Sequence, residues 1–355
     1  MTPIKRIGIL TGGGDAPGLN AVIRAVVKTA WTSGIGCLGL EDSYDGLLEF
    51  DRSRILAPRD VTGILRLGGT ILGTINTGNP FDSPVVTSEG PRVYSQRVVE
   101  MFQRLALDAL VVIGGDGTLA IAHRFCALGI PIVGVPKTID NDIVGTTNCF
   151  GFDTAVAFAT DAIDRLHTTA EAHHRIMVVE VMGRHAGWIG LYAGIAGGAD
   201  VILLPERPID LDEVSAILRK RQQRGKEFSI VVVAEGATFK DASIVTNAGK
   251  LDAFGHVRLG GIGQLLGEQI EERTGFETRV TVLGHIQRGG SPTAYDRVLG
   301  TRYGIKAMEL VEEGQFGYMA ALRCNQMIAI PIEEAVKQLK TVDPELYKIA
   351  TVFFG

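Results

Sequence analysis

The stretch ALVVIGGDGT, residues 109–118, decides the fold class of this 355-residue chain. Five apolar residues are followed at once by glycines that flank a single aspartate. A short apolar run is typical of a parallel strand buried on both faces, and the glycines indicate a turn into a helix. Similar runs recur along the chain, which predicts an α/β protein with mainly parallel sheets and covering helices. The strands are expected at 7–10, 109–113, 130–135, 176–181, 201–204, 228–234 and 278–283.

Apolar residues at helical spacing predict helices at 19–30, from about 154 to 166, and at about 211–224. The type of motif changes at 150–153, so we expect a domain border there. The polar, glycine-bearing stretch 236–262 is expected to be a surface excursion.

The composition excludes several classes of protein. Apolar residues make up 46% and charged residues 21%, which excludes global disorder. The formal charge of −5 comes without a long charge run, so nucleic-acid binding is not expected. The four cysteines form no C-x-x-C pair, which favours a reducing compartment over a zinc or disulfide framework. No apolar stretch approaches the roughly 18 residues that cross a bilayer. A cytoplasmic protein without a membrane partner is therefore expected.

Glycines gather in TGGGDAPG at 11–18, between a predicted strand and a predicted helix. Backbone amides at such a turn, with the positive end of the helix, suit a phosphate group. The dinucleotide pattern G-x-G-x-x-G fails because Pro17 stands at its third glycine, and the P-loop pattern lacks its Lys-Ser/Thr pair. The alternative is a tight turn with a packing role.

Asp116 follows the strand at 109–113, and PKTIDND at 136–142 follows the next strand. Open α/β sheets bind ligands at the carboxyl ends of their strands. An aspartate beside bare backbone can hold Mg²⁺ while the amides face phosphate oxygens. In an extended segment Asp140 and Asp142 would point the same way, one to take a proton and the other to help bind the metal. The alternative is a capped turn at Asp116 and a charged turn at 136–142.

A basic set stands at predicted strand ends. Arg175 starts a strand that Met182-Gly183-Arg184 ends, and Arg279, His285 and Arg288 surround the strand near 280. Such a set suits an anionic substrate that carries two phosphate groups' worth of charge. Each arginine alone is more often a member of a surface ion pair.

The motifs at 12–18, 114–118, 136–142, 182–184 and 281–290 together resemble the 6-phosphofructokinase family, over about residues 4–310. The resemblance implies two similar three-layer α/β domains, with mainly parallel sheets and the active site in the cleft between them. It implies glycolytic, Mg²⁺-dependent transfer of a phosphoryl group to the 1-hydroxyl of fructose 6-phosphate. It also implies a cytoplasmic homo-oligomer, a tetramer or a dimer. The domains would be 1–151 with about 288–337, which binds the donor, and 152–287 with about 338–355, which binds the sugar phosphate.

Family roles follow by position. Asp140 would be the general base, Arg184 would steady the transferring group, Thr138 and Lys137 would complete the catalytic set, and Asp116 and Asp142 would hold Mg²⁺. The donor-binding residues would be Gly14, Tyr44, Asn76, Gly117 and Thr118. The sugar-phosphate residues would be Thr138, Asp140, Asp142, Met182, Gly183, Arg184, Glu235, His285 and Arg288, with Arg175 and Arg279 reaching in from a neighbouring subunit.

The phosphoryl donor depends on four positions. In the family, Gly at 117 goes with ATP, while Asp there marks pyrophosphate users. Lys at 137 is typical of pyrophosphate users, and Gly117 with Lys137 resembles the mixed-type subgroup, whose members with that glycine mostly use ATP. Asn76 and Ile121 depart from the allosteric ATP enzymes, which have Arg and Gly there. We therefore expect ATP, with pyrophosphate as the alternative and ADP as a smaller one.

Two other functions stay open. A lipid or NAD kinase could share the Gly-Gly-Asp-Gly-Thr string, although Asp140, Asp142 and the motif at 284–290 disfavour it. A regulatory subunit that binds sugar phosphate without catalysis is expected to lose Asp140 or Arg184, and this chain has both.

Overall fold

The computed structural model describes residues 3–76, 78–82, 84–87, 90–241 and 261–354. The larger of its two main sheets has the strand order β13-β12-β7-β6-β1-β2-β3. Its five inner strands run parallel, and β3 and β13 pair antiparallel at the edges. All six residues of β6 are buried, as a central strand covered on both faces requires. The bounds are β1 (Arg6–Gly12), β2 (Gly36–Leu40), β3 (Ser53–Leu56), β6 (Ala109–Gly114), β7 (Ile132–Pro136), β12 (Tyr318–Arg323) and β13 (Gln326–Pro331).

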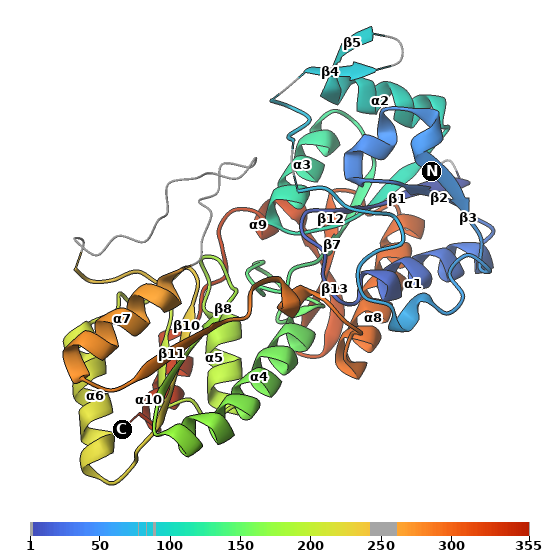
Figure 1. Cartoon of the computed structure of the whole chain (residues 1–355). Helices are drawn as coiled ribbons and strands as arrows, with labels where there is room; N and C mark the ends of the chain where they lie inside the picture. Colours follow the sequence, from blue (N-terminus) through green and yellow to red (C-terminus); the bar gives the residue numbers. More distant parts are fainter. Residues whose placement is uncertain (1–2, 77, 83, 88–89, 242–260, 355) are drawn as a thin grey trace.

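Helices cover both faces of this large sheet (Figure 1). On one face α1 (Leu19–Thr32) packs closely against α8 (Ala294–Glu312), because a Cβ on Gly304 would lie 2.7 Å from the Cβ of Ala25. The other face carries α2 (Tyr94–Arg104) and α3 (Asp116–Ala127). The shorter elements are the hairpin β4 (Pro84–Thr87) and β5 (Gly90–Val93), the turn α9 (Ile332–Ala335), and 3₁₀ turns at Ser43–Leu47, Phe50–Arg52, Ile64–Arg66 and Gly284–Arg288.

The smaller sheet has four parallel strands in the order β11-β8-β10-β9. One apolar core joins it to α4, α5 and α10, and a second core joins its other face to α6 and α7. The bounds are β8 (Ile176–Val181), β9 (Val201–Leu203), β10 (Ser229–Ala234), β11 (Thr278–Val282), α4 (Phe152–His173), α5 (Trp188–Ala196), α6 (Leu211–Gln223), α7 (Ile262–Thr274) and α10 (Pro344–Thr351).

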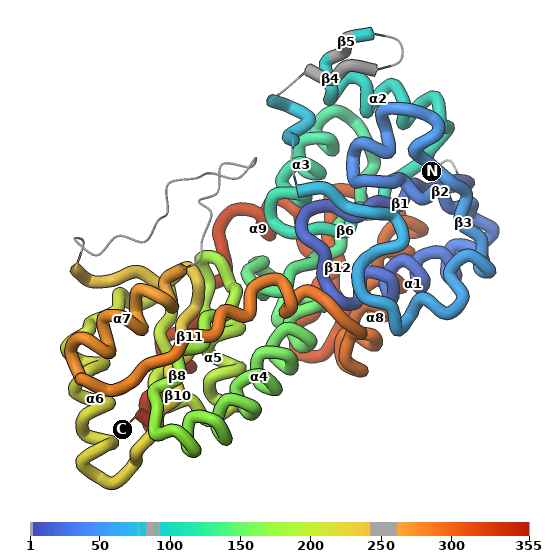
Figure 2. The backbone as a smooth tube through the Cα atoms, viewed as in Figure 1, coloured from blue at the N-terminus to red at the C-terminus, as the bar shows by residue number. Residues whose placement is uncertain are grey.

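The chain passes between the two sheets three times, as the tube in Figure 2 shows. The crossings lie between β7 and α4, between β11 and α8, and between α9 and α10. Three loops lie together at the carboxyl ends of neighbouring parallel strands of the large sheet. They are the glycine-rich loops after β1 and β6 and the loop after β7. Within the part of the chain described, no helix is long and apolar enough to cross a membrane.

The α/β class with mainly parallel sheets is confirmed, and each of the seven expected strands has its counterpart within a few residues. The three expected helices are also present, α4 running seven residues beyond the predicted end. The sequence patterns did not single out β2, β3, β12 or β13. These are the outer strands of the large sheet, and two glycines break the apolar run of β2. Most of the expected excursion at 236–262 lies outside the described residues, and the domain boundaries stay a prediction.

Candidate active site

The first glycine loop joins β1 to α1, and hydrogen bonds with residues 74–75 hold it in place. The amide of Gly13 donates to the carbonyl of Ile75 at 3.0 Å, and the hydroxyl of Thr74 donates to the carbonyl of Gly13 at 2.6 Å. Gly13 has a φ of 77°, which favours glycine. The contacts bring Asn76 to the same cavity as Gly14.

The second glycine loop joins β6 to α3, whose first residue is Asp116. The unpaired amides of a first helical turn carry partial positive charge, so this end of α3 suits a phosphate. A Cβ built on Gly117 would meet no atom of the described residues within 4 Å. Tyr44 lies behind this turn, buried, and its hydroxyl donates to the carbonyl of Thr118 at 3.2 Å. Tyr44 thus supports the first turn of α3 and is not among the residues that line the cavity.

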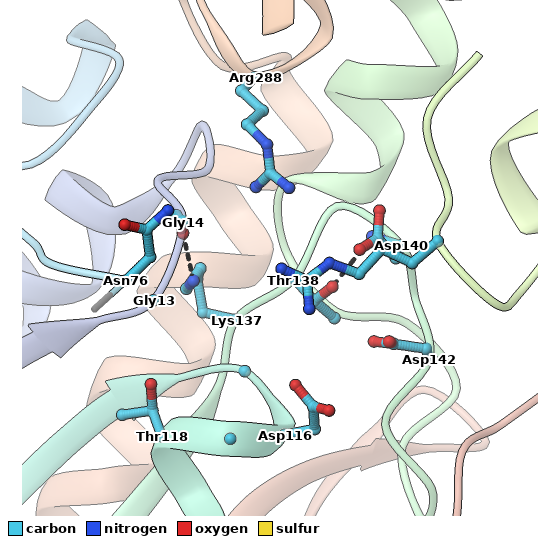
Figure 3. Close-up of a pocket in the computed structure, with 13 residues that line it drawn as sticks. Gly13, Gly14, Asn76, Asp116, Thr118, Lys137, Thr138, Asp140, Asp142 and Arg288 are labelled. Carbon is cyan, nitrogen blue, oxygen red and sulfur yellow. Dashed lines mark hydrogen bonds between the residues drawn. The ribbon is translucent and has the colours of Figure 1, made fainter. Parts of the chain in front are cut away.

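Lys137 opens the third loop and lies across from the first. Its amide donates to the carbonyl of Gly114 at 2.9 Å, and its ammonium group donates to the carbonyl of Gly14 (Figure 3). Burial lowers the pKa of Lys137 to about 8, an effect that the nearby Arg288 strengthens. The lysine therefore places a positive charge beside the first glycine loop, where it would contact an anion bound to that loop.

Asp140 and Asp142 line the same cavity, but the segment between them is not extended. Asn141 is left-handed, with a φ of 53°, and its side-chain carbonyl accepts from the amide of Cys149 at 3.0 Å. Among the described residues, Oδ1 of Asp140 and Oδ1 of Asp142 have no hydrogen-bond partner although both are buried. Burial raises the pKa of Asp140, and burial beside Asp140 and Asp116 raises the pKa of Asp142 to about 7. Buried oxygens of this kind take a partner from a ligand, an ion or water, so both are available to a molecule bound in the cavity.

Arg184 and Arg288 come from the small-sheet side. The amide of Arg184 donates to Oε1 of Glu235 at 3.2 Å, and Arg184 has a left-handed φ of 49°. Nη1 of Arg288 donates to the carbonyl of Asp15 at 3.2 Å, next to Gly14. The cavity thus lies between the two sheets. It is lined by Gly13, Gly14, Asn76, Gly115, Asp116, Gly117, Thr118, Lys137, Thr138, Asp140, Asp142, Arg184 and Arg288.

The sequence profile described as phosphofructokinase matches residues 6–311. The chain belongs to the phosphofructokinase family. One relative, 52% identical over 99% of this chain and all of its own length, is the pyrophosphate–fructose 6-phosphate 1-phosphotransferase of Streptomyces coelicolor. Another, also 52% identical, is the ATP-dependent 6-phosphofructokinase of Chloroflexus aurantiacus, aligned over 96% of this chain and 93% of its own.

Solved phosphofructokinase structures share the fold. The Saccharomyces cerevisiae structure superposes with a TM-score of 0.81 at 32% identity, over 98% of this chain and 46% of the yeast chain. The pyrophosphate-dependent enzyme of Marinobacter aquaeolei has a TM-score of 0.79 at 21% identity, over 96% of this chain and 86% of its own. The expected family and its two-sheet architecture are confirmed.

Several family positions lie outside the cavity lining. The carboxylate of Glu235 accepts a hydrogen bond from the backbone amide of Arg184, and burial raises the pKa of Glu235. Arg175 and Arg279 both pair with Glu277, Arg175 at 2.8 Å. Three more of these family positions also lie outside the cavity lining. They are the buried Met182, Gly183 with its positive φ, and the exposed His285.

Two lining residues, Gly13 and Gly115, received no individual role from the sequence, although both belong to the quoted glycine clusters. Within the described ranges, no group of three or more His, Cys, Asp or Glu side chains could hold a metal ion on its own.

Proposed function

We propose that this protein transfers the terminal phosphoryl group of ATP to the 1-hydroxyl of fructose 6-phosphate. The observation that carries the proposal is the meeting of two glycine turns, two carboxylates with buried unpartnered oxygens, one lysine and two arginines in a single cavity. Phosphoryl transfer needs positioning and charge stabilisation more than covalent chemistry. The named activities of the relatives agree with this chemistry.

Asp140 is the group we assign as general base. The residue is 4% exposed, and its backbone amide donates to Oγ1 of Thr138 at 3.0 Å. Its Oδ1 is buried and has no hydrogen-bond partner among the described residues. A sugar hydroxyl seated at that oxygen would give up its proton to Asp140 as the new O–P bond forms, while the bond between the γ-phosphorus and ADP breaks and ADP leaves. Arg184 would stabilise the charge of the transferring group, and Lys137 with the backbone amide of Gly14 would hold the donor.

Mg²⁺ fits the carboxylates present. Asp116 and Asp142 supply oxygen ligands, and Oδ1 of Asp142 is buried without a partner in the described structure. Magnesium usually binds one or two carboxylates together with substrate phosphates, which matches a site of this size. When bound, the ion would neutralise charge on the donor phosphates.

ATP is favoured over pyrophosphate by Gly117, because a Cβ there would have no described atom within 4 Å and this space would receive the nucleotide's α-phosphate. Lys137 keeps pyrophosphate as the alternative donor, because its buried ammonium suits either terminal phosphate. ADP stays a smaller alternative.

On the sugar side, Met182, Gly183, Glu235, His285 and Arg288 would hold fructose 6-phosphate. Arg175 and Arg279 would bind its phosphate from a second subunit of a dimer or tetramer, exchanging their shared Glu277 for the ligand. The protein would act in the cytoplasm.

The decisive assay measures fructose 1,6-bisphosphate formation with Mg²⁺ and ATP, pyrophosphate or ADP in parallel. Activity with ATP alone supports the proposal. Activity with pyrophosphate instead moves the function to the alternative donor, and no activity with any donor favours a regulatory subunit.

A pair of variants tests the donor assignment. Gly117→Asp should lower kcat/KM for ATP by about 10²-fold through like-charge contact with the nucleotide. Gly117→Ala is the control, because a methyl group there meets no described atom within 4 Å. Equal losses in both variants would refute a charge-based role for this position.

A further inference from the structure

The third crossing between the sheets carries a segment, residues 339–342, that contacts loops on both sides of the active site. On the large-sheet side, Leu339 forms a β-bridge with Ile143. The amide of Lys340 donates to the carbonyl of Asp142 at 2.8 Å. The segment therefore pairs directly with the loop that carries the two catalytic-site carboxylates.

The side chain of Lys340 strengthens this attachment. Its Nζ donates to the carbonyls of Thr146 at 3.0 Å and Thr147 at 2.9 Å, on the return arm of the same loop. Three hydrogen bonds from one residue thus hold both arms of the loop. An apolar side chain of equal length would fill the space but would leave both carbonyls without this donor.

Lys340 also reaches the small-sheet side. Its carbonyl accepts from Nε1 of Trp188 at 2.8 Å, and its ammonium lies 5.3 Å from the centre of the Trp188 ring. Trp188 is the first residue of α5, four positions after Arg184. A cation over a tryptophan ring is attracted to it, so the contact adds to the hydrogen bond.

Glu206 makes a second link on that side. Its Oε1 accepts from the amide of Val342 and from the amide of Gly187, both at 2.9 Å. Gly187 caps α5 and directly follows the turn that the amide of Ala186 closes on the carbonyl of Gly183. Residues 339–342 are therefore bonded directly to the Asp140–Asp142 loop, and through Trp188 and Glu206 they are bonded to the start of α5, which follows the Arg184 turn.

Both of these loops contain left-handed residues that are not glycine, Asn141 and Arg184. Such backbone persists only where its surroundings hold it. We propose that Lys340 is a positioning residue that keeps the Asp140–Asp142 loop and the Arg184 turn in a fixed relation across the cavity. The role rests on the proposed function, since it matters most for a reaction whose base and cation come from opposite sides. Displacing one reacting group by about 1 Å can cost 10²-fold in rate.

The central test replaces Lys340 by Met, which keeps length and volume but removes the ammonium group. We expect kcat to fall about tenfold or more, with both KM values within about twofold of the starting protein. Lys340→Arg, which keeps the charge and the donors, should restore most of the rate. The control is Lys337→Met, an exposed lysine three residues earlier that pairs only loosely with Glu333, at 3.8 Å.

Hydrogen exchange gives a readout that does not depend on the substrate. In Lys340→Met, peptides covering 140–148 and 183–188 should exchange faster together, and in Lys337→Met neither should change. Trp188→Phe keeps a ring and loses Nε1, so it should cause a smaller effect in the same two regions and serves if Lys340→Met does not fold.

The proposal is overturned by an unchanged kcat in Lys340→Met, by a rise in KM alone, or by faster exchange confined to one loop. A lower Tm with unchanged kcat would also reject it, because it would mean a structural role only. Failure of the proposed function shows separately, as a starting protein that forms no fructose 1,6-bisphosphate while the exchange prediction holds.

Discussion

Asp296 is a buried carboxyl group where helices from the two sheets meet, and its replacement by Asn makes a quantitative prediction. Asp296 stands in the first turn of α8 and is fully buried. Its Oδ2 accepts from the amide and the hydroxyl of Thr154, in the first turn of α4, at 2.8 and 2.6 Å. Its Oδ1 has no partner among the described residues. Asparagine can keep both accepted bonds while resembling the protonated acid.

The magnitude follows from the pKa of Asp296, which burial raises from 3.8 to about 6. A raised pKa means that the folded state binds the proton more tightly than the unfolded state does. The resulting stabilisation is full below pH 3.8 and is lost as the pH rises through about 6. The difference between the two pKa values corresponds to roughly 3 kcal/mol. Asp296→Asn should therefore match the starting protein near pH 4 and exceed its stability by up to about 3 kcal/mol at pH 7.5.

The measurement is urea denaturation of both proteins at steps from pH 4.5 to 7.5, compared as a difference so that other titrating groups cancel. Asp161→Asn, at an exposed residue of α4 that pairs with Arg165, is the control for the change from Asp to Asn outside the buried site. A difference for Asp296→Asn that stays constant with pH, or a variant less stable than the starting protein at pH 7.5, would refute the reasoning.

Three further outcomes are expected. Asp140→Ser should lower the rate by about 10²-fold or more while calorimetry shows fructose 6-phosphate binding largely kept, and near-normal turnover would reject Asp140 as the base. Gly236→Ala should lower both Tm and activity, because its Cβ would collide with the carbonyl of Arg184; a loss of activity without any change in Tm would contradict this steric cause. Chelation of Mg²⁺ by EDTA should abolish turnover and Mn²⁺ should restore part of it, whereas turnover that persists without divalent ions would exclude the metal role of Asp116 and Asp142.

Sequence patterns predicted the parts of the site that are local. Asp116 and Gly117 stand directly after a buried apolar run, so both the strand and the turn could be recognised from adjacent residues. The side chains of Asp140 and Asp142 were expected to point the same way, and both line the same cavity. The extended backbone expected between them was wrong, because Asn141 tolerates the left-handed conformation and the loop bends there.

Contacts between distant segments could not be predicted from one sequence. Lys340 and Trp188 are 152 positions apart, and neither belongs to a periodic pattern. Glu206 joins amides at 187 and 342, and backbone amides leave no trace in the residue types around them. Arg175 and Arg279 both pair with Glu277 because β8 and β11 are neighbours in the small sheet. The order of strands in a sheet cannot be read from one sequence.

Because the chain crosses three times between the sheets, the two sheets are completed at different times during synthesis on the ribosome. The small sheet is built from residues 176–282 and can form its last strand pair while the final 70 or so residues are still missing. The large sheet begins at residue 6 but needs β12, at 318–323, to cover the open side of β7. Until then the fully buried strand Ile132–Pro136 is an exposed edge that could pair with another chain. The sheet that starts first is therefore completed last, and β7 stays an unpaired edge from its own synthesis until β12 has been made.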